Sequence, residues 1–130
     1  MRLVLDTHIW IRWIAKGQSL DNSIVVTIEE AEYLAVSAIS CWEVAYLVKN
    51  GRLALPIPLD RWMVAALSGS GVSVIDISSE IAVASALLPD VHKDPADRLI
   101  IATALRSNCM LATCDAFIKQ YDAVKDCLIC

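Results

Sequence analysis

Residues 1–10 read MRLVLDTHIW, an apolar run that an acid, Asp6, closes before a second apolar segment begins. The first five residues have the length and composition of a buried strand. Asp6 and Thr7 can cap a helix in which Ile9, Trp10 and Trp13 recur at helical spacing. The same succession returns at residues 34–37, where LAVS leads into a helix from about Ser40 to Asn50. A strand that passes at once into a helix is typical of a parallel sheet.

The rest of the chain continues this alternation. Further strands are expected at residues 72–77 and 109–115, and residues 127–130 can form a last one. Helical segments are expected at 23–33, 59–71, 78–88, 96–108 and 116–121, the one at 78–88 being apolar enough to be largely buried. The predicted fold is therefore α/β, with a central, mostly parallel sheet of four to five strands flanked by helices. Length and composition favour a single domain over residues 1–130.

The composition bears on whether the protein enters a membrane, is secreted or binds a partner. It is 57% hydrophobic with a mean hydropathy of +0.55, yet no uncharged apolar run reaches the roughly 18 residues of a membrane span. No basic head followed by an apolar core opens the chain, so we expect no secretory signal and a cytoplasmic protein. The apolar surplus predicts a surface covered by a partner, in an oligomer or an obligate complex.

The charged residues and cysteines exclude some functions. A net charge of −4 argues against simple adhesion to nucleic acid, unless four acids are metal ligands, in which case the remaining eleven balance eleven lysines and arginines. Five cysteines, an odd number, are expected to be reduced thiols. Cys127-x-x-Cys130 has the spacing of half a zinc site or of a redox pair, but no second pair of ligands completes a zinc site, and we interpret the two cysteines as small apolar residues near the C-terminus.

Four acids are expected at one edge of the sheet, where open parallel sheets place their sites. Asp6 ends the first strand, Asp115 ends the fourth, Glu43 lies one turn into the helix after the second, and Asp97 lies in the first turn of a later helix. Carboxylates that crowd together repel unless a cation lies between them. An all-oxygen set suits Mg²⁺ or Mn²⁺, which points to phosphodiester hydrolysis.

Each acid also has a purely structural explanation. Asp6 and Asp115 can cap helices. Ser40-x-x-Glu43 has the form of a capping box. In DPAD, Asp94 can be the cap, Pro95 the first helical residue, and Asp97 an acid favoured by the helix dipole.

The segments LDTHIWIRW, VSAISCWEVAYLVKNGRL, HKDPADRLIIATAL and LATCDAFIKQY together resemble a PIN-domain protein, and specifically a VapC-type toxin of bacterial toxin–antitoxin pairs. The resemblance implies a PIN-like three-layer fold and a Mg²⁺- or Mn²⁺-dependent endoribonuclease that cuts RNA to block translation. It also implies a homodimer and a VapB-like antitoxin as partners. The family's acidic quartet maps onto Asp6, Glu43, Asp97 and Asp115, with Asp6, Asp97 and Asp115 as metal ligands; whether Asp94 shares the role of Asp97 stays open. Ile101 and the terminal CLIC depart from the pattern.

Several assignments beyond the quartet are hypotheses. Thr7 and Thr113 are expected as polar neighbours of the acids. His92, Lys93 and Arg98 are expected to contact RNA phosphates, whereas the position of His8 is explained by a helix start. The four tryptophans are expected in the core or an interface, with base stacking as the lesser alternative. The rival functions are a PIN-fold RNA-processing or DNA-directed nuclease without an antitoxin, and a non-enzymatic metal-binding regulator.

Overall fold

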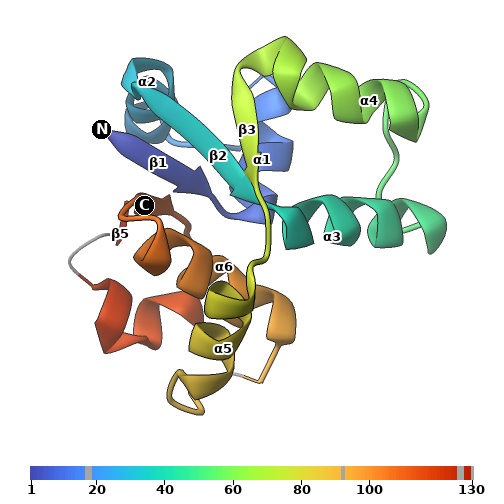
Figure 1. Ribbon diagram of the computed structural model, residues 1–130. Helices are drawn as coiled ribbons and strands as arrows, with labels where there is room; N and C mark the ends of the chain where they lie inside the picture. Colours follow the sequence, from blue (N-terminus) through green and yellow to red (C-terminus); the bar gives the residue numbers. More distant parts are fainter. Residues whose placement is uncertain (17–18, 92, 126–127, 130) are drawn as a thin grey trace.

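The computed structural model describes residues 1–16, 19–91, 93–125 and 128–129. Its strands form one sheet in the order β3-β2-β1-β4-β5, with every neighbouring pair parallel (Figure 1). The strands are β1 (Arg2–Leu5), β2 (Tyr33–Ser37), β3 (Val72–Ile75), β4 (Met110–Ala112) and β5 (Leu128–Ile129). The α-helices are α1 (Thr7–Ile14), α2 (Asn22–Glu30), α3 (Ala38–Lys49), α4 (Leu59–Ala66), α5 (Ser79–Leu87) and α6 (Pro95–Arg106). Short 3₁₀ turns are η1 (Ser68–Ser70), η2 (Ile118–Gln120) and η3 (Asp122–Val124). The α/β fold with a parallel sheet is confirmed.

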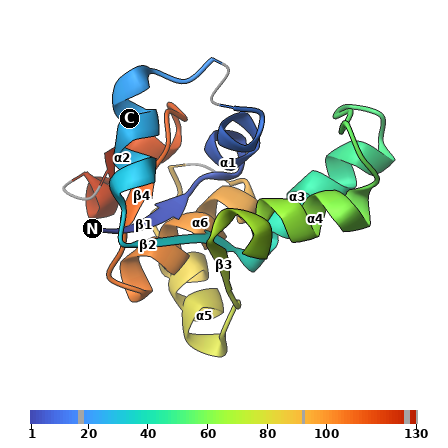
Figure 2. The same ribbon diagram turned by 90° about the horizontal axis from the view of Figure 1, so that it is seen from above.

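Helices cover both faces of the sheet and give three layers. Helices α1 and α2 lie on one face and α5 and α6 on the other, while α3 and α4 extend beyond the end of the sheet (Figure 2). The first strand, β1, is central, and its side chains alternate between the two faces. Leu3 and Leu5 enter one hydrophobic cluster with α1, α2 and α4, whereas Val4 enters a second cluster with α6.

Two tryptophans fix the position of α4 against α1. Trp10 and Trp62 are buried, and their ring centroids lie 5.1 Å apart at an interplanar angle of 59°. The indole N–H of Trp10 donates to the carbonyl oxygen of Ala66 at 3.0 Å, so its one polar atom has a partner inside the core. Core packing, expected for the tryptophans, is confirmed for these two.

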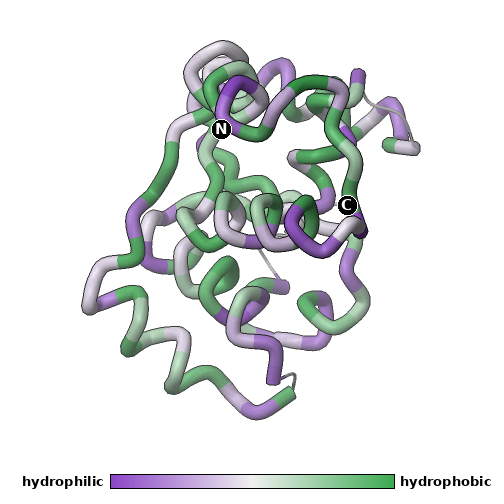
Figure 3. Tube along the Cα trace, turned by 90° about the vertical axis from the view of Figure 1, so that its right-hand side faces the viewer, coloured by the Kyte–Doolittle hydropathy of each residue, from purple (hydrophilic) through white to green (hydrophobic). Residues whose placement is uncertain are grey.

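Helix α5 differs from its prediction. Val83 and Leu87 are 58% and 78% exposed, so the expectation of a largely buried helix is wrong. An almost uniformly apolar sequence has no periodicity to show which side faces the sheet, and here only one side does. Hydrophobic stretches accordingly occur at the periphery of the trace as well as in its centre (Figure 3).

The cysteines do not all follow the expected pattern. Cys41 and Cys109 are free thiols, but Cys114, exposed after β4, is disulfide-bonded, so the expectation of five reduced thiols is wrong. Cys127 and Cys130 lie outside the described residues. Over the described part of the chain, none of the helices has the length and apolar character needed to cross a membrane.

Candidate active site

The carboxyl ends of three adjacent parallel strands bring the predicted acids together. Asp6 follows β1 directly, and its backbone N–H donates to Ala112 O of neighbouring β4 at 2.9 Å. Glu43 lies on the second turn of α3, which begins where β2 ends. Asp115 comes three residues after the end of β4. Asp97 lies in the first turn of α6, which packs against α3 and the sheet.

Asp6 is a buried carboxylate whose side chain does not cap its helix. It occupies the N-cap position of α1, but its side chain makes no capping hydrogen bond to that helix. Instead, the hydroxyl of Thr113 donates to Asp6 Oδ2 at 2.7 Å across the sheet edge. Asp6 is only 4% exposed, and burial raises its pKa, while the bond from Thr113 opposes that rise. The capping explanation therefore does not account for this acid.

Glu43 is held by a threonine and not by a capping box. Thr7 Oγ1 lies 2.6 Å from Glu43 Oε1 and 2.7 Å from Ser40 Oγ. A hydroxyl carries one proton, so Thr7 gives it to the carboxylate and accepts from Ser40. Ser37 caps α3 by accepting from the amide of Ile39, which places Ser40 inside the helix and removes the basis for the capping box.

Burial and the charge of every other acid in the cluster raise the pKa of Asp97. Burial, followed by the charges of Asp94, Asp115, Asp6 and Glu43, raises its pKa from 3.8 to about 7. Burial likewise raises the pKa of Glu43, to which the charges of Asp6 and Asp94 add. The four predicted acids thus belong to one electrostatic unit, and Asp94 belongs to it as well.

Asp94 and Asp115 combine a capping role with a place in the cluster. Asp94 Oδ1 accepts from the amide of Ala96 at 3.0 Å and caps α6, as predicted. Asp115 Oδ1 accepts from the amides of Phe117 and Ile118 at 2.8 and 3.0 Å, at the start of η2. The Asp115 amide donates to Thr113 Oγ1 at 3.0 Å, so this one threonine connects Asp6 and Asp115.

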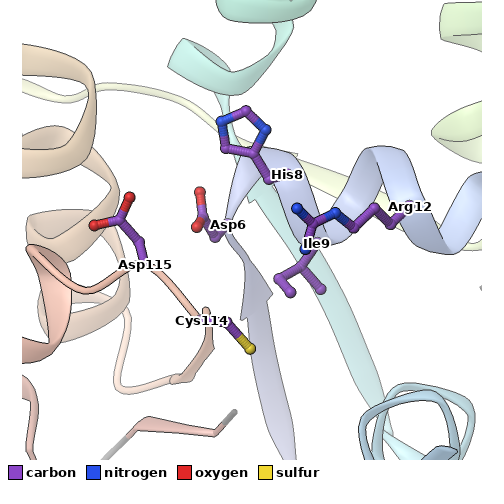
Figure 4. A pocket seen from close by; sticks show the side chains of 6 residues that line it. All are labelled: Asp6, His8, Ile9, Arg12, Cys114 and Asp115. Atoms are coloured by element: carbon purple, nitrogen blue, oxygen red, sulfur yellow. The ribbon is translucent and has the colours of Figure 1, made fainter. Parts of the chain in front are cut away.

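A hollow of about 130 Å³ opens beside Asp6 and Asp115. Its wall is completed by His8, Ile9, Arg12 and Cys114, and the guanidinium of Arg12 extends back along α1 towards the acids (Figure 4). Arg12 was not among the residues predicted for the site. Its spacing of four from His8, on a helix that begins at the first acid, is the signal that would have identified it.

The three cationic residues predicted to contact RNA have different outcomes. The guanidinium of Arg98 donates to the carbonyl oxygens of Ser85, Ala86, Leu88 and Pro89 at 2.7–3.1 Å, and its side chain is only 11% exposed. A phosphate would have to displace these carbonyls, so the structure gives Arg98 the role of joining the end of α5 to α6. Lys93 is exposed and lines a separate hollow beside Arg98. His92 lies outside the described residues.

The donor chemistry of the cluster fits a hard divalent cation. Its donors are carboxylates, and burial together with the neighbouring acids raises the pKa of Asp6, Glu43 and Asp97; a cation among the carboxylates relieves the mutual repulsion. Among the described residues, no group of three or more Asp, Glu, His or Cys side chains is already arranged to hold a metal ion. Mg²⁺ prefers oxygen ligands and keeps several of its waters, so it does not need a complete set of protein ligands.

Comparison with known proteins gives a consistent picture. Residues 3–124 match the family model described as PIN domain. The chain is 35% identical over 120 residues to Ribonuclease VapC22 of Mycobacterium tuberculosis, covering 92% of this chain and 91% of that protein. Similar solved structures include VapBC2 from Rickettsia felis bound to a promoter DNA fragment, with a TM-score of 0.71 and 20% identity over 99% of this chain and 98% of that one. A toxin–antitoxin complex from Klebsiella pneumoniae matches with a TM-score of 0.65 and 22% identity over 98% and 96%.

Proposed function

The chain belongs to the PIN-domain family, and from this membership we propose that it is a cytoplasmic endoribonuclease, the toxin of a toxin–antitoxin pair. Its relative at 35% identity is named as a ribonuclease. One observation carries the proposal: four separate segments deliver acids to one sheet edge, where burial and the charges of the other acids raise the pKa of Asp97 to about 7. A cluster of this kind is costly for folding, so its presence favours a catalytic use.

The proposed metal ligands are Asp6, Asp97 and Asp115, and the proposed ion is Mg²⁺ or Mn²⁺. When bound, such an ion supplies a water of lowered pKa and neutralises charge on the phosphate. Thr113 orients Asp6 and Asp115 for this task, because its hydroxyl donates to one and accepts from the amide of the other. Whether Asp94 shares in binding is left to experiment.

Glu43 is proposed as the residue that orients the attacking water and accepts its proton. Burial and the nearby acids raise its pKa, which brings a carboxylate closer to the range of a useful general base. The bond from Thr7 fixes the position of Oε1 and leaves the second oxygen, Oε2, available for the water. Arg12, at the rim of the hollow, and Lys93, on the exposed loop, are proposed contacts for RNA phosphates.

The proposed partners are a VapB-like antitoxin and a second copy of the chain. Structures similar to this one come from toxin–antitoxin complexes. The exposed apolar residues on β3 and α5, which include Val74, Val83 and Leu87, are surface that a partner would cover.

The test is induced expression of the wild type and Asp6→Ala without antitoxin, with growth and total RNA followed together. Glu29→Gln, a change at an exposed acid on α2, serves as the matched control. We expect growth arrest and discrete RNA fragments with the wild type and the control, and neither with Asp6→Ala. Purified protein should cut RNA with Mg²⁺ and stop when the metal is chelated.

Other outcomes identify the rival functions. Cleavage of DNA in preference to RNA would indicate a DNA-directed nuclease. Cleavage of RNA without growth arrest would favour an RNA-processing enzyme. Absence of any cleavage by the wild type would leave a metal-binding regulator and refute the nuclease assignment.

A further inference from the structure

Two aromatic side chains stand in solvent on α3 next to the acidic cluster. Trp42 and Tyr46 are 55% and 47% exposed, and their rings stack with centroids 4.9 Å apart at an interplanar angle of 13°. Trp42 was expected in the core or an interface, and within this chain it is not buried. Exposing an indole to water is unfavourable, and the stacked arrangement leaves planar aromatic surface accessible.

The aromatic pair shares a hollow with the candidate active site. This hollow, of about 310 Å³, is lined by His8, Trp42, Glu43, Tyr46, Leu47, Arg52, Asp94 and Ala96. Glu43 follows Trp42 directly in the sequence, so the proposed general base and the indole leave α3 one residue apart. A molecule that occupies the hollow would meet a flat aromatic surface, one guanidinium and the edge of the acidic cluster.

We propose that Trp42 and Tyr46 form a stacking platform for one unpaired base of the substrate, adjacent to the scissile phosphate. This inference rests on the proposed ribonuclease function and adds to it a subsite that receives one unpaired base. Every base has a π-face that can stack on an indole, and a base inside a duplex cannot reach the platform. Arg52 contacts a backbone phosphate of the bound strand.

The charge pattern favours a nucleotide over a peptide helix as the occupant. An apolar helix face would bury Glu43, Asp94 and Arg52 without partners, which is costly. A nucleotide matches each group, because its base covers the aromatic rings, its phosphate pairs with Arg52, and the next phosphate lies towards the acids. The hollow is therefore continuous with the site at which cleavage is proposed.

The first experiment measures RNA binding without cleavage. All proteins carry Asp6→Ala, and the probe is a short fluorescein-labelled oligoadenylate followed by anisotropy. We expect Trp42→Ala to weaken binding about tenfold and Tyr46→Ala to weaken it less, because the loss of one stacked base has an effect of this size. Trp42→Phe should keep most of the affinity. Val26→Ala, at an exposed apolar residue on α2, should leave it unchanged. Thermal unfolding of each variant confirms that it is folded.

A second measurement separates stacking from general damage to the surface. Oligoadenylates with a single abasic position are compared on proteins with Trp42 and with Trp42→Ala. At the stacked position the abasic substitution should abolish the difference between the two proteins, and elsewhere the difference should persist. Arg52→Ala should lower the slope of log affinity against log salt by about 0.7, the value for one phosphate on a single strand.

Each contrary result has a defined meaning. Equal affinity of Trp42→Ala and its parent overturns the platform while the ribonuclease function stands, since the wild type would still cut RNA. If Trp42→Ala keeps RNA binding but loses an antitoxin peptide, the aromatic pair belongs to the protein partner and the proposal is wrong. If the wild-type protein neither cuts nor binds RNA, the proposed function fails and the platform fails with it.

Discussion

Removal of the charge of Asp97 should stabilise the metal-free protein. Burial and four neighbouring acids raise the pKa of Asp97 from 3.8 to about 7, so its ionised form is unfavourable in the folded state. One pKa unit corresponds to about 1.4 kcal/mol, and the full shift to about 4 kcal/mol. Because Asp97 is only half-buried, solvent screening reduces this to about 1–2 kcal/mol. Asp97→Asn should gain that amount, or about 4–7 °C in Tm for a chain of 130 residues.

The stability that Asp97→Asn gains over the wild type should increase as the pH rises. The folded state binds the Asp97 proton more tightly than the unfolded state, so between pH 4 and pH 7 the wild type loses stability as pH rises. Below pH 4 the acid is protonated in both states and the variant has no advantage. Above pH 7 the acid is ionised in both states and the advantage is complete.

Urea denaturation at pH 4.5 and pH 8, in the presence of a chelator, measures the effect. Glu29→Gln, at an exposed acid, should change the free energy of unfolding by less than about 0.5 kcal/mol. Added Mg²⁺ should reverse the order, because a ligand present at a hundred times its Kd stabilises the wild type by about 2.7 kcal/mol. A variant that is less stable than the wild type at pH 8 without metal would refute the reasoning.

Three further changes probe the supports of the site. Thr113→Val removes the donor to the buried carboxylate of Asp6 and should cost about 1–3 kcal/mol in urea denaturation at pH 8; no loss would mean that this bond does not hold Asp6. Arg98→Ala leaves four carbonyl oxygens without their donor and should cost on the order of 3 kcal/mol, and a change below about 0.5 kcal/mol would contradict the structural role given to Arg98. Asp94→Asn keeps a capping side chain but removes a charge, so the pKa of Asp97, followed by carbon-detected NMR, should fall; an unchanged pKa would show that Asp94 lies outside the electrostatic unit.

The acidic cluster was predictable because parallel strands impose a geometric rule. Once β1, β2 and β4 are identified as strands, their carboxyl ends must meet, and the acids that follow them must approach one another. No detail of packing is needed for that conclusion. The cap at Asp94 was predictable in the same way, from the Asp-Pro dipeptide at a helix start.

Residue roles that depend on helix phase or on distant backbone were not predictable. Helix α3 begins at Ala38 because Ser37 caps it, and this early start turned Ser40 and Glu43 towards Thr7 and away from a capping box. Trp42 is exposed because α3 extends beyond the sheet, and periodicity alone does not show where a helix leaves its cover. Arg98 found its acceptors at the end of another helix, a contact that no local pattern encodes.

The central position of β1 determines when the site can come into existence during synthesis. Of the strands in this sheet, β1 is synthesised first, and it cannot pair with β4, its neighbour on one side, until residues 110–112 have been made. At elongation rates of roughly 5–20 residues per second this delay is ~10 s. The hydrogen bond from Thr113 to Asp6 joins residues 107 positions apart in the sequence. A chain that ends before Thr113 therefore contains Asp6 but lacks the hydroxyl that holds its carboxylate in place. The acidic site therefore assembles only when translation of the domain is nearly complete.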